Sequence, residues 1–488
     1  MFGILKWTLL LSAFSAVILA GLAMIENWRG EKVWTAYRAR AARDGTKLDL
    51  AAFLQAPLRD VENFTAHPLF NEIFEKPKAA MLAKAQLALP AERKPATFLG
   101  GFPGQGFVDL TVWRDYFVHS KFLADPGPTA AGDVLLALER FSPLLDSLHK
   151  AGLQPTGQFP VPWNRGFEAE LSHLGIFQNA TTLRALRLSA RLNKRESAAA
   201  YEEWHDILRM YRAIQNEPSL IAGLVRISFL SQLCSAVRIG LKDEAWDSVE
   251  LGKMAADLAA LNVLEDYTFA VQSERALLNQ HLDQIGAAPF WQRHKLIKST
   301  SEDILGIGPD ALPFEPWLER WMPAGWHRQN QLAANHCIDT QLARVDLPAQ
   351  RFDLSDESPA SSDWLLQRNP RRFCFGFLRS ANVYGGIEKR YVSTWTVVQL
   401  ARIAIALEQF RSAHEYPETL EALVPSYLPS LPRELFADLP FLYRKTEDGR
   451  FFLYSRALNQ KDDGGSSDLK KTVTQQSDWV WSYQAARP

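Results

Sequence analysis

The pattern of apolar and polar positions begins with an uncharged segment, residues 7–25, with the sequence WTLLLSAFSAVILAGLAMI. A helix over this segment spans about 28 Å, close to the roughly 30 Å hydrocarbon core of a bilayer. Trp7 and Trp28 flank it, and aromatic side chains favour the membrane interface. We therefore predict a transmembrane anchor over residues 1–28, although the small residues near Ala23 also fit a cleaved signal peptide.

Further along, apolar residues that recur every three or four positions predict helices. The pattern covers residues 130–153 and 167–283, and residues 26–47 are predicted to form a charged helix that continues out of the membrane. Pro218 fits the first turn of a helix in the last range. Amphipathic helices with short joins predict helical hairpins or a small solenoid. Two apolar stripes mark these helices: Trp204, Ile207, Leu208, Tyr211 and Ile214, and then Leu220, Leu224, Ile227, Leu230, Cys234, Val237 and Leu241.

Residues 392–413 predict a different kind of helix, which is apolar nearly all round in its second half. Such a helix must be covered by other elements. The Tyr416-Pro417 step ends it. One or two helical turns follow at residues 418–424, with three side chains predicted to face inward: Leu420, Leu423 and Val424.

Two short aromatic strands are predicted next, at residues 441–446 and 450–455. Asp448-Gly449 lies between them, and an Asp-Gly pair between two such strands is a strong signal for a β-hairpin. Residues 478–484, DWVWSYQ, predict a last strand. The helix and these strands together predict a small α+β unit.

The predicted fold is therefore mainly α. It comprises an N-terminal transmembrane helix at residues 1–28, a membrane-proximal helical and mixed region at 29–160, an α-helical hairpin or solenoid-like domain with Trp- and Pro-rich connections at 161–390, and a small α+β domain with an antiparallel sheet at 391–488. A length of 488 residues suits a division into several domains.

Composition and charge argue against a nucleic-acid partner. The net charge is −1, and 47% of the residues are hydrophobic, which is an ordinary globular mixture. Four arginines recur at helical spacing without interleaved aromatic residues, and they predict a solvated helix face: Arg184, Arg187, Arg191 and Arg195.

Motifs for common chemistry are weak in this sequence. The cysteines Cys234, Cys337 and Cys374 form no CxxC pair, and Cys234 is predicted to be a buried thiol. The segment LGGFPGQG at 99–106 lacks the Lys-Ser/Thr of a phosphate loop and predicts a turn. The sequence contains neither GxSxG nor HExxH.

Two further groups are predicted to be structural. His327, His336 and Cys337 lack the spacing that places two metal ligands on one helical face. Trp317 and Trp321 are one helical turn apart, and we expect them to cap a core rather than to stack on a ligand.

The order of parts near the C-terminus resembles the C-terminal half of the major pseudopilins of type II secretion systems. The matching text is ALEQFRSAHEYPETLEALV, followed by LPRELF, FLYR, FFLYSRALNQKDDGG and DWVW, within residues 392–482. The resemblance implies a pseudopilin-like fold for the final domain. The whole layout, with KLDLAAF and VENF near residues 47–64, is also similar to a group of bacterial membrane-anchored proteins, which implies no particular activity.

In pseudopilins the last loop binds calcium, and the resemblance implies a corresponding site here. The matching positions are Asn459, Asp463, Asp468 and Asp478, and Asn459 stands where a pseudopilin has an Asp. Calcium prefers several oxygen ligands, which this loop can supply. A solvated acidic turn is the alternative.

The start of the module differs from that of a pseudopilin. A pseudopilin carries a processed Gly and then a Glu at the start of its own membrane helix, whereas GGIEKRY at 385–391 is followed by no apolar run of membrane length. The predicted anchor lies far upstream and lacks this motif. We therefore predict a pseudopilin-like folded unit that is not processed as a pilin.

Two signals disagree about the side of the membrane on which the body lies. A calcium-binding, pseudopilin-like tail favours the periplasm. The positive-inside rule favours a cytoplasmic body because six basic residues follow the span: Arg29, Lys32, Arg38, Arg40, Arg43 and Lys47. We predict a single-pass protein of the bacterial inner membrane with most of the chain in the periplasm.

These observations predict a non-enzymatic protein-interaction or scaffold module. The N-terminal helix would hold it at the membrane, and its partners would be other envelope proteins, with no nucleic acid. One alternative is an accessory component of a type II secretion-like machine. Another is an envelope hydrolase with a carboxylate-based site, because acidic residues far apart in the sequence can meet in space.

Overall fold

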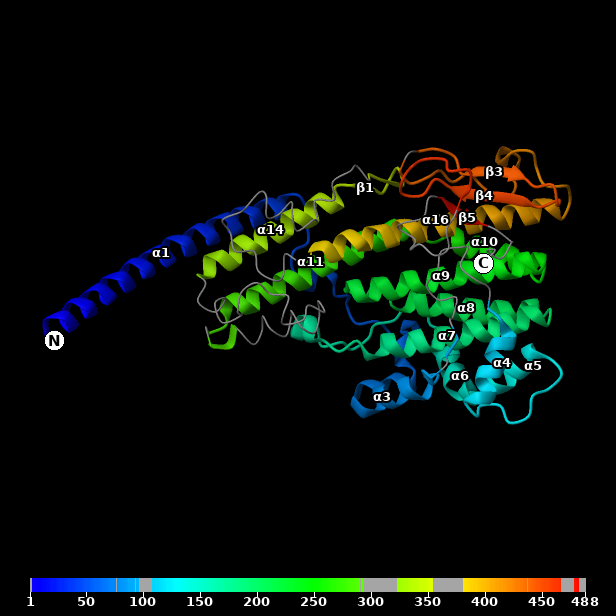
Figure 1. Cartoon of the computed structure of the whole chain (residues 1–488), viewed down its shortest axis with the longest axis horizontal. Helices are drawn as coiled ribbons and strands as arrows, with labels where there is room; N and C mark the ends of the chain where they lie inside the picture. Colours follow the sequence, from blue (N-terminus) through cyan, green and yellow to red (C-terminus); the bar gives the residue numbers. More distant parts are fainter. Residues whose placement is uncertain are drawn as a thin grey trace.

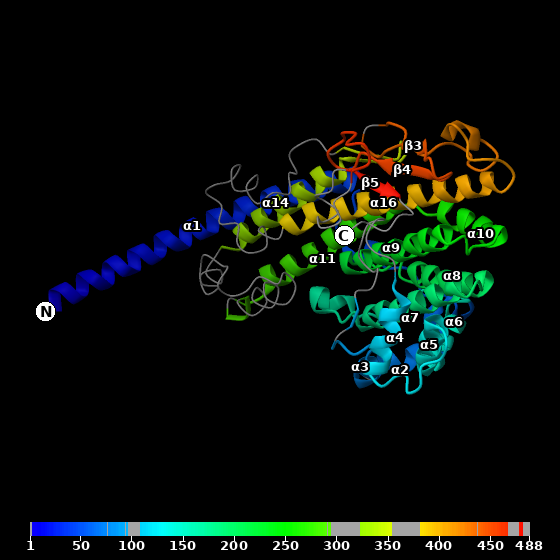
Figure 2. The ribbon, with the colours of Figure 1, turned by 45° about the vertical axis from the view of Figure 1, so that its right-hand side comes forward.

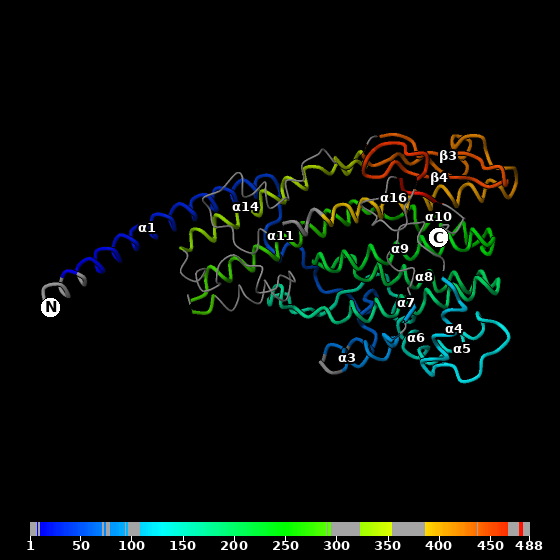
Figure 3. Tube along the Cα trace, viewed as in Figure 1, coloured from blue at the N-terminus to red at the C-terminus, as the bar shows by residue number. Residues whose placement is uncertain are grey.

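The computed structural model describes residues 2–75, 77–92, 94–95, 108–289, 291–293, 323–353, 381–436, 438–466 and 478–481. Over these residues the chain is mainly helical, with a small antiparallel sheet and a long apolar helix at the N-terminus (Figure 1). The trace in Figure 3 shows this helix leaving the body at the end of the molecule that is opposite to the sheet.

Helix α1 (Phe2–Arg43) joins the apolar segment and the charged segment into one continuous helix, as predicted. Its apolar part projects away from the body (Figure 1), and it is long and apolar enough to cross a membrane or to act as a signal sequence. The helix at Leu220–Lys242 is also long and apolar enough to cross a membrane, but it is largely buried in the body. Large apolar side chains are exposed along α1: Trp7, Leu10, Leu11, Phe14, Val17, Ile18, Leu19, Leu22, Met24, Ile25 and Trp28.

After α1 the chain forms a series of short helices. The predicted helical region at 130–153 is confirmed as α5 and α6, which bury an apolar face. Asp109 caps α4 by accepting hydrogen bonds from the N–H groups of Thr111 and Val112. The elements are η1 (Leu50–Phe53), η2 (Asp60–Glu62), η3 (Phe64–Ala66), α2 (Pro68–Glu75), α3 (Pro77–Gln86), α4 (Leu110–His119), α5 (Ala130–Leu138), η4 (Glu139–Phe141), α6 (Ser142–Ala151) and η5 (Trp163–Glu168).

Five longer helices form the centre of the molecule and confirm the helices predicted there. They are α7 (Ser172–Asn193), α8 (Ser197–Ala213), α9 (Leu220–Lys242), α10 (Ser248–Ala259) and α11 (Val263–Ala287). Figure 1 shows α7, α8 and α9 side by side, and the predicted stripes fill their interfaces. The prediction for Pro218 is wrong by two positions. Helix α9 begins at Leu220 because the Ser219 hydroxyl accepts a hydrogen bond from the N–H of Ile221 and caps the helix there.

The predicted apolar helix near the C-terminus is α16 (Ala381–Arg411), which starts earlier than expected. Between residues 397 and 407 every side chain except that of Arg402 is buried. The helix lies between α9, α10 and α11 on one side and the sheet on the other (Figure 2), so other elements cover it, as predicted. Before it come α14 (Ala324–Leu342) and two short antiparallel strands, β1 (Val345–Asp346) and β2 (Arg351–Phe352).

The predicted hairpin and last strand are confirmed. Strands β3 (Leu442–Lys445), β4 (Phe451–Ser455) and β5 (Trp479–Trp481) pair antiparallel in that order. Gly449 in the turn has a φ of +72°, a left-handed conformation that glycine adopts readily. In η8 (Leu420–Leu423) both leucines are buried, but Val424 is 36% exposed. Its predicted inward position is wrong because the backbone becomes extended at Val424, which turns its side chain away from the helical face.

One apolar core connects these parts. A single cluster of buried side chains includes Phe64 in η3, Trp204 in α8, Leu400 in α16 and Trp481 in β5. The boundary predicted between residues 390 and 391 falls within α16, which packs on the central helices as well as on the sheet.

Candidate functional site

The first candidate site is the contact between α1 and α14, which we call the joint. The backbones of the two helices approach closely at Gly30 and Gly325. A Cβ atom on Gly30 would overlap the backbone of Gly325, and a Cβ atom on Gly325 would overlap the backbone of Glu26. Glycine permits this close approach because it has no side chain. The body is therefore packed directly onto α1, just after the apolar segment ends.

Hydrogen bonds close this joint. The N–H of Gly325 donates to Asn27 Oδ1 at 2.8 Å. Glu26 Oε2 accepts hydrogen bonds from Trp326 Nε1 and Gln329 Nε2, both at 3.1 Å. Bonds on two successive residues of α1 fix the direction of this helix relative to the body.

The contact continues along the later turns of α1. Arg328 Nε on α14 lies 3.1 Å from Glu31 Oε2, and the Tyr37 hydroxyl donates to Asp339 Oδ2 at 2.9 Å. Arg275 on α11 donates to the other oxygen of Asp339 at 2.8 Å. Burial and the neighbouring Asp339 carboxylate raise the pKa of Tyr37, which keeps this hydroxyl protonated as a donor. Three helices are thus connected through one aspartate.

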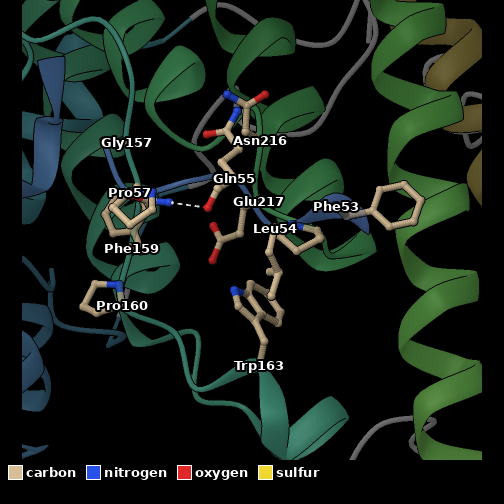
Figure 4. A pocket seen from close by; sticks show the side chains of 12 residues that line it. Phe53, Leu54, Gln55, Pro57, Gly157, Phe159, Pro160, Trp163, Asn216 and Glu217 are labelled. Atoms are coloured by element: carbon tan, nitrogen blue, oxygen red, sulfur yellow. Dashed lines mark hydrogen bonds between the residues drawn. The ribbon is translucent and has the colours of Figure 1, made fainter. Parts of the chain in front are cut away.

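The second feature is a pocket of about 350 Å³ between η1, the loop before η5 and the loop before α9. Its walls are largely aromatic and aliphatic (Figure 4). In this view the Glu217 carboxylate lies between Leu54, Phe159 and Trp163. Glu217 is the one ionisable side chain among the described residues that line the pocket.

Glu217 is held in place by a buried histidine. His173 Nε2 lies 2.9 Å from both carboxylate oxygens of Glu217. The His173 ring is fully buried and stacks on Phe159 with 4.2 Å between ring centroids. Sequence reasoning missed this pair because 44 residues separate its members and neither belongs to a motif.

The rim of the pocket is built by the Gln158 side chain. Its Nε2 donates to the carbonyl oxygens of Gln55 and Ala56 at 3.0 and 3.1 Å, and its Oε1 accepts from the N–H of Leu58 at 2.9 Å. One side chain therefore fixes the extended segment after η1, and the pocket is largely preformed, as ligand sites usually are.

The described lining of this pocket supplies an apolar surface with one ionisable group. A carboxylate-based hydrolase needs two carboxylates that face each other. The described lining supplies one carboxylate, Glu217, and no Ser, Thr, Cys or Lys side chain that would act as a nucleophile.

The C-terminal loop brings together three of the four predicted calcium ligands, and the fourth, Asp468, lies outside the described residues. Asn459 Nδ2 donates to Asp463 Oδ2 at 2.6 Å. The N–H groups of Asp463 and Gly465 donate to Asp478 Oδ2 at 3.1 and 2.8 Å. The loop therefore folds around the Asp478 carboxylate.

Asp478 is the buried member of this group. It is 0% exposed, and its Oδ1 has no hydrogen-bond partner within the described part of the chain. Burial, and to a lesser extent the nearby charges of Asp463 and Asp462, raise the pKa of Asp478. A cation at this oxygen would relieve both effects, which fits calcium. However, the described residues contain no group of three His, Cys, Asp or Glu side chains that could hold a metal ion, so calcium binding stays a prediction.

The solvated face predicted for the four arginines is wrong for Arg184, Arg187 and Arg191, whereas Arg195, which follows the end of α7, is exposed. Arg184 is buried, and its Nη1 lies 2.7 Å from carboxylate oxygens of both Glu203 and Asp206. Arg187 Nε is 2.8 Å from Glu203. Helix α8 packs on α7 here and supplies carboxylates that neutralise the arginines, a pairing that helical spacing within α7 alone does not reveal.

The predicted buried thiol is confirmed. Cys234 is 0% exposed, and burial raises the pKa of this thiol and that of Cys337, the latter to about 12. Burial also lowers the pKa of His327 to about 4, so that this ring is neutral at pH 7. Several residues named in the sequence analysis lie outside the described residues: 99–106, Trp317, Trp321 and Cys374.

The fold and these sites define a helical protein with a projecting apolar helix fixed directly to its body and an aromatic pocket on the body. Comparison with known protein families, with curated proteins and with solved structures gives no match for the chain. The pseudopilin-like character of the final domain therefore stays a prediction that rests on the residues quoted for it.

Proposed function

We propose that the protein is a single-pass membrane protein whose helical body docks other envelope proteins and catalyses no reaction. The observation that carries the proposal is the joint at Gly30 and Gly325. The apolar part of α1 continues without a break into the part that packs on α14, so the anchor and the body are one folded unit. A signal peptide that is removed needs no such continuity.

The location is part of the same proposal. We place the chain in the bacterial inner membrane with its body in the periplasm. The support is the resemblance of the C-terminal module to pseudopilins, together with the buried Asp478 carboxylate. Its Oδ1 has no hydrogen-bond partner among the described residues and suits a calcium ion outside the cytosol.

The pocket supplies the docking point. Its volume of about 350 Å³ suits one or two apolar side chains of a partner, and aromatic walls commonly anchor such contacts. Glu217 adds one carboxylate that would orient a polar or basic group of the partner.

The test is chemical crosslinking in living cells followed by purification of the full chain in detergent. Leu54→Arg places a charge in the lining of the pocket, and Leu136→Arg, at a similarly exposed leucine on α5, is the matched control. We expect the native chain and Leu136→Arg to recover the same envelope proteins and Leu54→Arg to lose them. Equal recovery by all three chains would contradict docking at the pocket, and recovery of secretion-system components would identify the machine served.

A further inference from the structure

Helices α1, α11 and α14 pack together at the end of the body next to the anchor, and ion pairs between them show which residues of the three helices lie at the same level. Arg328 on α14 is paired with both Glu31 on α1 and Asp283 on α11, so these two acidic residues lie at the same height. Helix α11 runs antiparallel to α14, because Asn279 is bonded to Asn335 at 2.7 Å, further from the anchor. The C-terminal end of α11 therefore lies at the end of the body from which the apolar part of α1 projects, as Figure 2 shows.

The end of α11 reaches the level at which the apolar segment ends. Helix α11 continues four residues beyond Asp283 to Ala287, an advance of about 6 Å at 1.5 Å per residue. The same advance along α1 from Glu31 leads to Asn27, beside Trp28 at the end of the predicted anchor. The end of α11 is thus level with the membrane interface if α1 crosses the membrane, and Trp291 follows four residues later.

The side chains at this level suit a membrane interface. Trp291 is 65% exposed and Trp28 on α1 is 63% exposed, and indole rings with an apolar body and a polar N–H favour this zone. Arg293 lies at the same tip, where it donates to the carbonyl oxygens of Ala288 and Gly286 at 3.0 and 3.2 Å. Its positive charge stabilises the C-terminal end of the helix and suits phosphate headgroups nearby.

We propose that the end of α11, with Trp291 in the segment that follows it, is a second membrane contact that enters the headgroup layer beside α1. The inference rests on the proposed function, because it requires α1 to be a membrane span. Two contacts that are joined through α14 would hold the body at a fixed tilt on the lipid surface, with the pocket at a constant height.

The test is photocrosslinking of the full chain in phosphatidylcholine nanodiscs. p-Benzoylphenylalanine replaces Trp291, replaces Trp28 as the positive control, and replaces Val249 on α10 as a negative control of similar exposure, 62%. We expect lipid adducts at positions 28 and 291 and none at 249. Circular dichroism verifies that each variant is folded.

The possible outcomes distinguish a failure of this inference from a failure of the proposed membrane anchor. Adducts at position 28 without adducts at 291 would overturn this inference and leave the anchor intact. The absence of adducts at both positions would overturn the anchor as well. Adducts from 291 to protein instead of lipid would show that a partner chain, and not the membrane, covers the tip of α11.

Discussion

Single residues decide how the anchor is attached to the body. Gly30 and Gly325 carry no side chain at the point where two helices meet, and the neighbouring Glu26 and Asn27 supply the acceptors for three hydrogen bonds. None of these residues stands out in the sequence. Isolated glycines in helical segments are common, and the residues that they meet lie about 300 positions away.

The close contact at this joint can be tested by adding a methyl group to one of its glycines. Gly30→Ala should destabilise the chain by about 1–3 kcal/mol, because the new Cβ forces the two backbones apart. Gly386→Ala on α16 is the control, since nothing lies within 4 Å of a Cβ there, and it should stabilise by about 0.5–1 kcal/mol. Urea unfolding in detergent measures both changes. Equal stability changes at the two positions would contradict the close packing of α1 on α14.

The raised pKa of Glu274 should make the free energy of unfolding depend on pH. This carboxylate on α11 accepts a hydrogen bond from the N–H of Leu220 at 3.1 Å, and burial raises its pKa from 4.5 to about 7. Because the folded pKa is the higher one, ionisation opposes folding, and the destabilisation grows as the pH rises from about 4.5 to about 7.

Glu274→Gln removes this charge and keeps an acceptor for Leu220. We expect it to stabilise the chain by about 1–2 kcal/mol at pH 8, less than the full shift implies because the side chain is only partly buried. The gain should vanish near pH 4.5. Thermal unfolding at both pH values measures it, and a gain of equal size at both would show that the charge is not its cause.

At the scale of elements, the sequence predicted what depends on local pattern. Apolar spacing identified α7 to α11, and the Asp-Gly pair identified the β3–β4 hairpin, because both signals reside in neighbouring residues. The features that the sequence did not predict depend on contacts between elements that are far apart in the chain. The Arg184 pairing with Glu203 requires α8 to fold back on α7, and the pocket requires segments around residues 54, 159 and 217 to converge.

The C-terminal loop offers a test at this scale. If the loop binds calcium as the pseudopilin resemblance implies, added Ca²⁺ should slow hydrogen exchange in residues 459–466 and in β5, because the ion would tie Asp478 to the loop. Asp478→Asn, which keeps the shape but loses the charge, should abolish the protection. Identical exchange of the native chain in Ca²⁺ and in a chelator would contradict the calcium site.

At the scale of the whole molecule, the body is fixed directly to the long apolar helix α1, which we propose to be a membrane span. The single core from η3 to β5 makes the body one unit, and the joint with α14 fixes its orientation on the anchor. Sequence reasoning located the apolar helix, whose composition is a local property. It missed the rigid joint, which depends on the fold of residues 324–342.

The side of the membrane is the next prediction at this scale. Fusion of alkaline phosphatase after Pro488 should give an active enzyme, and fusion of green fluorescent protein exported by the same route should stay dark, because we propose that the body lies in the periplasm. A fluorescent fusion with an inactive phosphatase would reverse the topology and follow the basic residues after the span.

The most direct test of the central claim is the mass of the mature chain in membranes washed with alkaline carbonate. An uncleaved anchor that is part of the fold predicts the intact chain in the membrane pellet, with the apolar segment still attached. A soluble chain that lacks this segment would contradict the account.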